Sequence, residues 1–180
     1  MDFQPETTRP LSLTMLHTLY GHAIWARDRL LPLIESLEQE QLTASEHKGV
    51  YGSIHDTLAH MAASEWMWFQ RSQGEPPSRI PNGEDFKDLR AIVVWWNEVH
   101  AQVDQYLSTI SDTILNTEVT YLGPDGRWRT RKVWHMLLQV PNHQTDHRSQ
   151  IATILGSMGL EVPQTDLVVF LSERYVMGDA

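Results

Sequence analysis

Apolar residues recur at helical spacing through four long stretches of this 180-residue chain, and this pattern constrains its fold more than any other feature. The first stretch shows the spacing at Met15, Leu19, Ala26, Leu33 and Leu37. The pattern predicts long helices over about 11–42, 53–73, 84–110 and 132–158. Pro32 lies inside the first, where we expect it to kink or interrupt the helix, and Pro141 lies inside the fourth.

Local signals mark the ends of these helices. The run Ser53-Ile54-His55-Asp56 resembles a capping box with aspartate in place of glutamate, so it should start the second helix. Gly74 and the two prolines that follow should end it. Residues 43–52 read as a loop, and a short last helix is expected at about 165–175, after Pro163.

A β-hairpin is predicted between the third and fourth helices. Residues 117–122 and 127–130 are rich in threonine and aromatic side chains, and they flank the turn Gly123-Pro124-Asp125-Gly126. Four long helices joined by short to moderate connections favour an all-α, antiparallel four-helix bundle. The hairpin is then an insertion, and the chain forms a single domain over 1–180.

Charge and composition exclude several classes of function. The formal charge is −9, which opposes binding to nucleic acid. The basic cluster lies along a predicted strand, where a solvated strand face explains it; its members are Arg127, Arg129, Arg131 and Lys132. The first ten residues lack the features of a signal peptide, and no apolar run approaches the ~20 residues of a membrane span. We therefore expect a cytoplasmic protein with no membrane partner.

The sharpest local feature is the pair His143 and His147 on the fourth helix. Their spacing puts both imidazoles on one helix face, one turn apart, where both can reach one ion. The same face carries Met136, Val140, Ile151, Ile154 and Met158. Imidazoles directed at an apolar core need polar partners. A metal ion satisfies both, but hydrogen bonds to a glutamate or to backbone carbonyls would also do so.

A catalytic metal site usually has three protein ligands, so a third must come from another helix. The candidates are His22, His55, His60, His100 and Glu65. Periodicity places His22 and Glu65 on apolar faces and His60 off the apolar stripe, as a surface or side-wall residue. His55 and His100 are expected to be solvated. Three further histidines have no companion feature: His17, His47 and His135.

Several segments together resemble the DinB-like family, which shares a superfamily with the bacillithiol- and mycothiol-dependent S-transferases. The first segment is Tyr20–Leu31 with Trp25-Ala26, and the second is the helix Ser53–Trp66 with its Leu58, His60, Glu65 and Trp66. The third is Gly126-Arg127-Trp128 before Val133-Trp134, and the last is Gly159 with Asp166-Leu167. Between these two lies Asn142–Ile151, which is similar to the family's "nHxxxHRgQi". The resemblance implies an antiparallel four-helix bundle. It also implies a three-histidine metal site, whose ligands here would be His60, His143 and His147.

This sequence departs from the family pattern at four positions. Arg27 stands where the family often has asparagine, Gln139 where it often has histidine, and Ser149 in place of glycine. Pro141 is a further departure, just upstream of the histidine pair. None of these changes removes a proposed ligand.

The resemblance favours a metal-dependent enzyme that acts on a small molecule, either a thiol S-transferase or a hydrolase. Zn²⁺ or Ni²⁺ is the expected cofactor, with a low-molecular-weight thiol as co-substrate. The chain has no cysteine, which fits a thiol supplied from outside. His22, Glu65 and Gln150 are candidates to orient a ligand or to move a proton.

Two other functions stay open. One is a stress-related protein that binds a metal or ligand without turnover, and the other is a structural bundle with no metal. A homodimer is a further expectation, because the tryptophan-rich helices exceed what one core easily hides; the residues concerned are Trp66, Trp68, Trp95 and Trp96. The alternative is that these rings simply fill the bundle.

Overall fold

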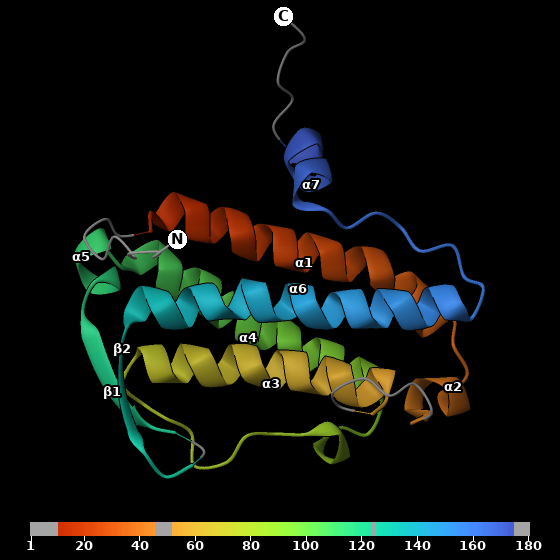
Figure 1. Cartoon of the computed structure of the whole chain (residues 1–180), viewed down its shortest axis with the longest axis horizontal. Coiled ribbons are helices and arrows are strands. Elements are labelled where there is room, and N and C mark those ends of the chain that lie inside the picture. The colour runs from red at the N-terminus through yellow and green to blue at the C-terminus, as the bar shows by residue number, and fades with distance from the viewer. Residues whose placement is uncertain (1–10, 46–51, 124, 175–180) are drawn as a thin grey trace, which may run out of the picture.

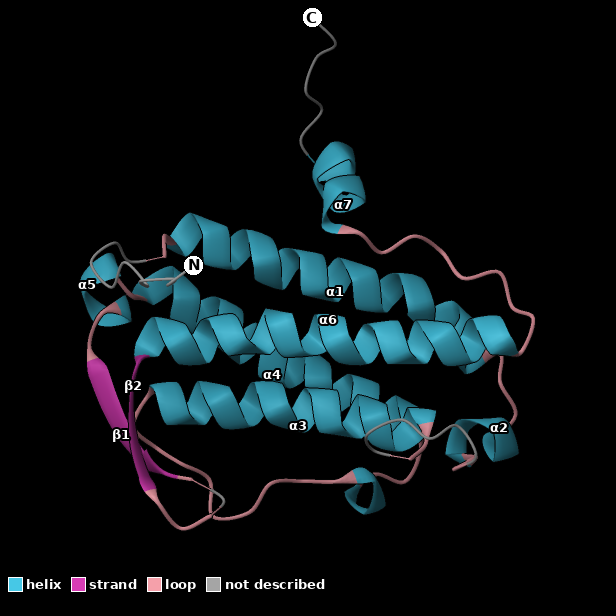
Figure 2. Ribbon diagram, viewed as in Figure 1, coloured by secondary structure: helices cyan, strands magenta, loops and turns pink. Residues whose placement is uncertain are grey.

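The computed structural model describes residues 11–45, 52–123 and 125–174 (Figure 1). It is mostly helical, with one small two-stranded antiparallel sheet, as the sequence predicts (Figure 2). The long helices are α1 (Leu13–Glu35), α3 (Ile54–Ser72), α4 (Leu89–Thr109) and α6 (Val133–Ser157). The short ones are α2 (Gln39–Thr43), the 3₁₀ turn η1 (Gly83–Asp85), α5 (Asp112–Leu115) and α7 (Leu167–Arg174).

The four long helices lie side by side. In Figure 1, α6 runs between α1 and α3, and α4 lies behind them. The contacts agree with this view, since α3 packs on both α6 and α4, and α1 packs on the same two helices. The interface between α3 and α6 is therefore the place where side chains from the second and fourth long helices meet. None of the helices in the described ranges is long and apolar enough to cross a membrane.

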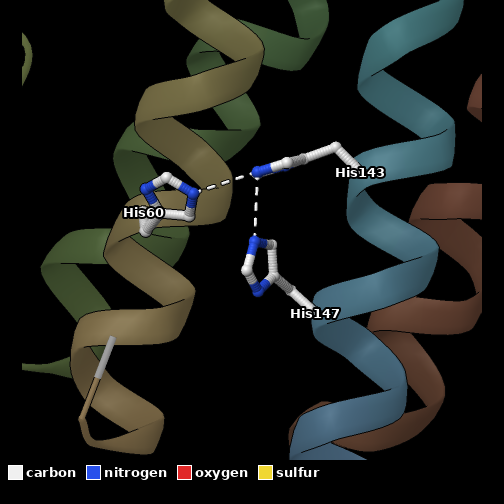
Figure 3. A group of neighbouring side chains, drawn as sticks. All are labelled: His60, His143 and His147. Carbon is white, nitrogen blue, oxygen red and sulfur yellow. Dashed lines mark hydrogen bonds between the residues drawn. The ribbon is translucent and has the colours of Figure 1, made fainter. Parts of the chain in front are cut away.

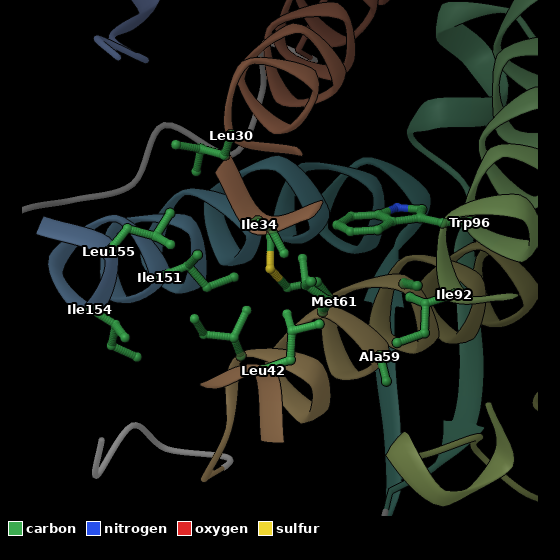
Figure 4. Packing of buried hydrophobic residues seen from close by; sticks show 13 residues of the cluster. Leu30, Ile34, Leu42, Ala59, Met61, Ile92, Trp96, Ile151, Ile154 and Leu155 are labelled. Atoms are coloured by element: carbon green, nitrogen blue, oxygen red, sulfur yellow. The ribbon is translucent and has the colours of Figure 1, made fainter. Parts of the chain in front are cut away.

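The apolar faces of the helices meet in two clusters along the interior. The cluster drawn in Figure 4 joins α1, α2, α3, α4 and α6 through side chains that include Leu30, Leu42, Met61, Trp96 and Leu155. The second cluster is built on residues such as Leu16, Phe69, Val103 and Leu137. Each large side chain buried in this way contributes about 1.5–3 kcal/mol, so these stripes fix the positions of the helices.

The residues predicted to form the first helix form two helices, α1 and α2. We expected helix to about residue 42, but α1 ends at Glu35 and α2 begins at Gln39. Pro32 lies inside the last turn of α1 and does not interrupt it there. The break follows because the backbone N–H of Glu38 donates to the side chain of Gln41 at 2.9 Å, which starts a new helix. The loop expected over 43–52 lies partly outside the described residues, as does His47 within it.

The second predicted helix agrees closely with α3. The Ser53 hydroxyl accepts the backbone N–H of Asp56 at 3.0 Å and donates to the Asp56 carboxylate at 2.7 Å. The predicted cap is thus present, although the carboxylate bonds the serine hydroxyl. At the other end, Gly74 has φ +82° and the N–H of Glu75 reaches the carbonyl of Gln70, which closes the helix.

The third predicted helix begins five residues later than expected. Its start was placed at Glu84, but residues 83–85 form the separate turn η1 and α4 begins at Leu89. The reason is local, since the Asp88 carboxylate accepts the N–H of Ala91 at 2.9 Å and caps the helix there. This leaves η1 packed beside α3.

The predicted hairpin is present as β1 (Glu118–Leu122) and β2 (Trp128–Lys132), with Tyr121 opposite Arg129. The Asp125 carboxylate in the turn accepts two hydrogen bonds from the Arg129 guanidinium, at 2.9 and 3.0 Å. The short helix α5 before the hairpin was not predicted. The fourth long helix and the last short helix were both predicted close to their observed bounds.

Candidate metal centre

Three histidines from two helices meet at the interface of α3 and α6 (Figure 3). The Nε2 atoms of His60 and His143 are 3.0 Å apart, and those of His143 and His147 are 3.1 Å apart. The candidate ligand atoms of the three residues all lie within 4.8 Å of one another. The structure therefore brings together the three residues that the family resemblance named as ligands.

Helix geometry explains this convergence. His143 and His147 are four residues apart on α6, so both rings leave the same face. His60 lies on α3 and is half-buried, as a side-wall residue would be, but its ring is directed across the interface to α6. The ring centroid of His60 lies 4.9 Å from the ring centroid of His143 and 4.9 Å from that of His147. A residue off the apolar stripe can thus reach a site between two helices.

Burial keeps two of these rings neutral. Desolvation, reinforced by the neighbouring His143 and His147, lowers the pKa of His60 to about 3. Desolvation and the neighbouring His147 lower the pKa of His143 to about 4. At neutral pH both imidazoles are uncharged, which is the form in which histidine binds a metal.

The donor set fits a metal ion better than it fits hydrogen bonding alone. The Nε2 atom of His143 lies within 3.1 Å of two other Nε2 atoms, but it carries only one proton or one lone pair. His143 Nε2 can therefore form a good hydrogen bond with only one of these two nitrogen atoms, and its contact with the other has no proton between the two atoms. With metal–nitrogen bonds of about 2.1 Å, tetrahedral ligands lie roughly 3.4 Å apart, close to the observed spacing. The group can therefore bind a divalent ion after small side-chain movements.

One neighbouring side chain forms a hydrogen bond with a candidate ligand. Gln150 Oε1 lies 2.9 Å from His147 Nδ1, so the Nδ1 proton is held by the amide oxygen. The Nε2 lone pair of His147 then faces the other two histidines. The Nδ1 atom of His143 is buried without a hydrogen-bond partner. Gln150 was one of the candidates for an orienting role, and the structure places it in contact with a proposed ligand.

Glu65 lies in a separate buried network beside the three histidines. Its side chain is 1% exposed, and its carboxylate accepts from Trp96 Nε1 at 2.8 Å and Gln144 Nε2 at 2.6 Å. His100 Nδ1 lies 3.0 Å from the other carboxylate oxygen. The expectation that His100 is solvated is wrong, because it pairs with this buried carboxylate. Gln144 lies between His143 and His147 in the sequence, so the network ties α3 and α4 to the turn of α6 that carries the site.

The other histidines in the described ranges lie outside the three-histidine group. His22 Nε2 is 2.8 Å from the carbonyl of Thr165, and its ring packs on Trp25 and Phe170. These contacts place it beside α7 and the segment that leads into it, and desolvation lowers its pKa. His55 was expected to be solvated, but it is buried at the start of α3. His17 and His135 belong to neither group.

Sequence reasoning did not identify Gln144, Trp96 and His100 as the partners of Glu65, although His100 was a candidate metal ligand. One signal pointed to them: Glu65 falls in the apolar stripe of its helix, so it had to find donors on neighbouring helices. Which donors these would be depended on how α4 and α6 pack against α3.

A cavity adjoins the candidate centre. It has a volume of about 280 Å³ and is lined by Asp56, His60, Pro81, Asn82, Gly83 and Glu84. Because His60 forms part of its wall, a small molecule in this cavity would lie beside the three-histidine group.

The chain matches known proteins over most of its length. The family model described as the DinB family matches residues 10–175. Protein DinB of Bacillus subtilis (strain 168) is 24% identical over 162 residues, which cover 85% of this chain and 91% of that protein. The matched region includes all three histidines.

Proposed function

The chain belongs to the DinB family, and from that premise we propose that it is a metal-dependent enzyme of the thiol S-transferase or hydrolase type. His60, His143 and His147 hold the ion, and Zn²⁺ or Ni²⁺ is the expected metal. The observation that carries the proposal is the meeting of three histidines from two different helices, whose candidate ligand atoms all lie within 4.8 Å of one another. Three imidazoles suit several first-row metals, so the ligands alone do not select between them.

When bound, such an ion lowers the pKa of a coordinated water or thiol, which supplies a nucleophile at neutral pH. The residues of the chain prepare the site for this chemistry. Burial keeps the rings of His60 and His143 neutral, and Gln150 holds the ring of His147 in one orientation. The Glu65 network holds α6 against α3, so the two halves of the site keep their spacing.

A low-molecular-weight thiol is the co-substrate that we propose. The chain contains no cysteine, so any thiol that reacts must come from a small molecule. The resemblance of the sequence to the superfamily of bacillithiol- and mycothiol-dependent S-transferases supports this choice. The cavity beside His60 offers a place for such a molecule.

A second candidate function is metal or ligand binding without turnover. One observation favours it: both oxygens of Glu65, the buried carboxylate among the described residues, are already bound to donors on α4 and α6. This carboxylate is therefore not free to serve as a general base. Under this proposal the same three histidines bind the ion.

The proposal also covers the scaffold, the location and the oligomeric state of the protein. We propose that α1, α3, α4 and α6 form an antiparallel four-helix bundle that acts as the scaffold of the site, within a single domain over 1–180. A cytoplasmic location and a homodimer complete the proposal. Trp96 is fully buried and Trp66 packs on Trp95, so these rings also serve the interior, and size-exclusion chromatography with light scattering would decide whether a dimer forms.

The test is an activity assay with matched variants. Untagged protein loaded with Zn²⁺ or Ni²⁺ would be assayed for transfer of a small thiol to an electrophile and for ester hydrolysis. We expect activity that EDTA and His60→Ala both abolish, and that His135→Ala, an exposed histidine on α6, leaves unchanged. Metal binding without either activity would instead favour the binding protein.

A further inference from the structure

A second cavity lies on the far side of α6 from the three histidines. Its volume is about 410 Å³, and it opens to solvent between α1, α6 and the segment that leads into α7. The α6 residues that line it include Leu138, Pro141, Thr145 and Arg148. At about 100° per residue, these positions face nearly opposite to His143 and His147. The two sites are therefore on different faces of the same helix. We call this space the Arg148 cavity.

The walls of the Arg148 cavity are held by specific contacts. His22 Nε2 donates to the carbonyl of Thr165 at 2.8 Å, which fixes the segment before α7 against α1. Phe170 of α7 then packs on the rings of His22 and Trp25. Leu19 and Leu167 add apolar surface from the two sides. A cavity of this volume with mainly apolar walls is typical of a site for a small organic molecule.

The buried charged group of this cavity is Arg148, which the exposed Asp166 carboxylate attracts without forming an ion pair. Arg148 is 4% exposed, and its Nη2 donates to the Thr145 hydroxyl at a long 3.3 Å. Nη1 is buried and has no hydrogen-bond partner. Within the described ranges, no carboxylate lies within ion-pair distance of this guanidinium.

Among the described residues, the other two buried arginines have a carboxylate or aromatic partner in direct contact. Arg27 lies 2.8 Å from the Asp28 carboxylate and stacks over Trp96. Arg71 stacks over the rings of Trp68 and Tyr121. A buried cation with neither kind of partner is costly, and an anion bound beside it would remove much of that cost. Of these three arginines, Arg148 is thus the one that an anionic ligand would stabilise most.

We propose that the Arg148 cavity binds a small apolar molecule that carries one carboxylate. The planar guanidinium pairs well with a carboxylate, and the leucine and proline side chains receive the apolar body. Asp166 also lines the cavity, and its side chain is exposed. That carboxylate offsets part of the Arg148 charge, so the cavity accommodates at most one further negative charge, and a monocarboxylate binds better than a phosphate dianion.

The test uses benzoate as the probe, with benzamide as its neutral counterpart and phenyl phosphate as the dianion. Binding to the full-length protein would be followed by ligand-observed NMR titration. We expect saturable binding of benzoate that is roughly tenfold or more tighter than binding of either comparison compound, since only benzoate brings one compensating charge. Equal affinity for benzamide would overturn the proposal, and so would equal or tighter binding of phenyl phosphate.

Two variants assign the site. Arg148→Met removes the charge, and Leu19→Trp fills the cavity from α1 without changing α6; both should abolish saturable benzoate binding. Circular dichroism would confirm folding, and Leu19→Trp decides the matter if Arg148→Met does not fold. Benzoate should still bind to His60→Ala and to EDTA-treated protein, because the histidines face the other side of α6. Loss of binding in those samples, or its persistence in both cavity variants, would contradict the proposal.

Discussion

The Nε2 atoms of His60 and His143 lie 3.0 Å apart, although 83 residues separate the two histidines in the chain. Only the packing of α3 against α6 brings them together. The contact is the point at which the fold and the proposed chemistry depend on each other.

Gln150→Ala should weaken metal binding without removing a ligand. The amide oxygen of Gln150 holds the Nδ1 proton of His147 at 2.9 Å, and loss of such a partner lowers affinity by roughly 10- to 100-fold. Competition with a chromophoric chelator would measure the affinity. Ser149→Ala, an exposed neighbour on the same helix, is the control and should bind as tightly as the wild type. Unchanged affinity in Gln150→Ala would show that the amide does not orient the ligand.

The metal-free protein should lose stability as the pH falls below about 6.5. The folded-state pKa values of His60 and His143 are about 3 and about 4, below the ordinary histidine value of about 6.5. Between about pH 6.5 and 4 the unfolded chain therefore binds more protons at these residues than the folded chain, so the free energy of unfolding decreases with falling pH. At pH values well above 6.5, where both residues are neutral in the folded and the unfolded chain, they contribute almost no slope.

Urea unfolding of the metal-free protein at pH 7.5 and pH 5 would check this. The double variant His60→Ala, His143→Ala should show a smaller difference in the free energy of unfolding between the two pH values. His17→Ala, a partly exposed histidine on α1, should keep the wild-type difference. An identical pH dependence in the double variant and the wild type would contradict the burial of neutral rings.

Glu65→Gln should destabilise the fold. Both Trp96 Nε1 and Gln144 Nε2 donate to the Glu65 carboxylate, and an amide at this position cannot accept from every donor now bound to the two oxygens. A buried donor left without a partner costs about 1–3 kcal/mol, so we expect a loss of about 2 kcal/mol in the free energy of unfolding. Glu98→Gln, at an exposed position on α4, is the matched control and should change little. Equal stability of the two variants would mean that the network does not hold the helices together.

The sequence predicted the parts of the fold that depend on local pattern. The spacing of apolar residues gave α3 and α6 nearly to their ends, and Ser53 and Gly74 marked where α3 begins and ends. It failed where a side-chain cap interrupts a continuing apolar pattern. Glu38 starts α2 within the first predicted helix, and Asp88 delays the start of α4. At each of these positions a single side-chain hydrogen bond decides where the helix starts, and the spacing of apolar residues does not reveal it.

The site was predictable only in part. The pair His143 and His147 follows from helical spacing alone. His60 does not, because periodicity describes the centre of a buried face, and this residue lies at its edge, where only the position of the neighbouring helix decides what it meets. The partners of Glu65 escaped prediction for the same reason. His60 was identified as a candidate ligand by the resemblance to the DinB-like family and not by helical periodicity.

The most direct test of the central claim is the metal content of protein expressed without a histidine tag. Elemental analysis would compare the wild type with His143→Ala, His147→Ala, and with the exposed control His135→Ala. The account predicts about one equivalent of a divalent metal in the wild type and the control, and none in the double variant. If the wild type binds no metal even after addition of Zn²⁺ and Ni²⁺, or if the double variant binds as much as the wild type, the three histidines are not a metal centre.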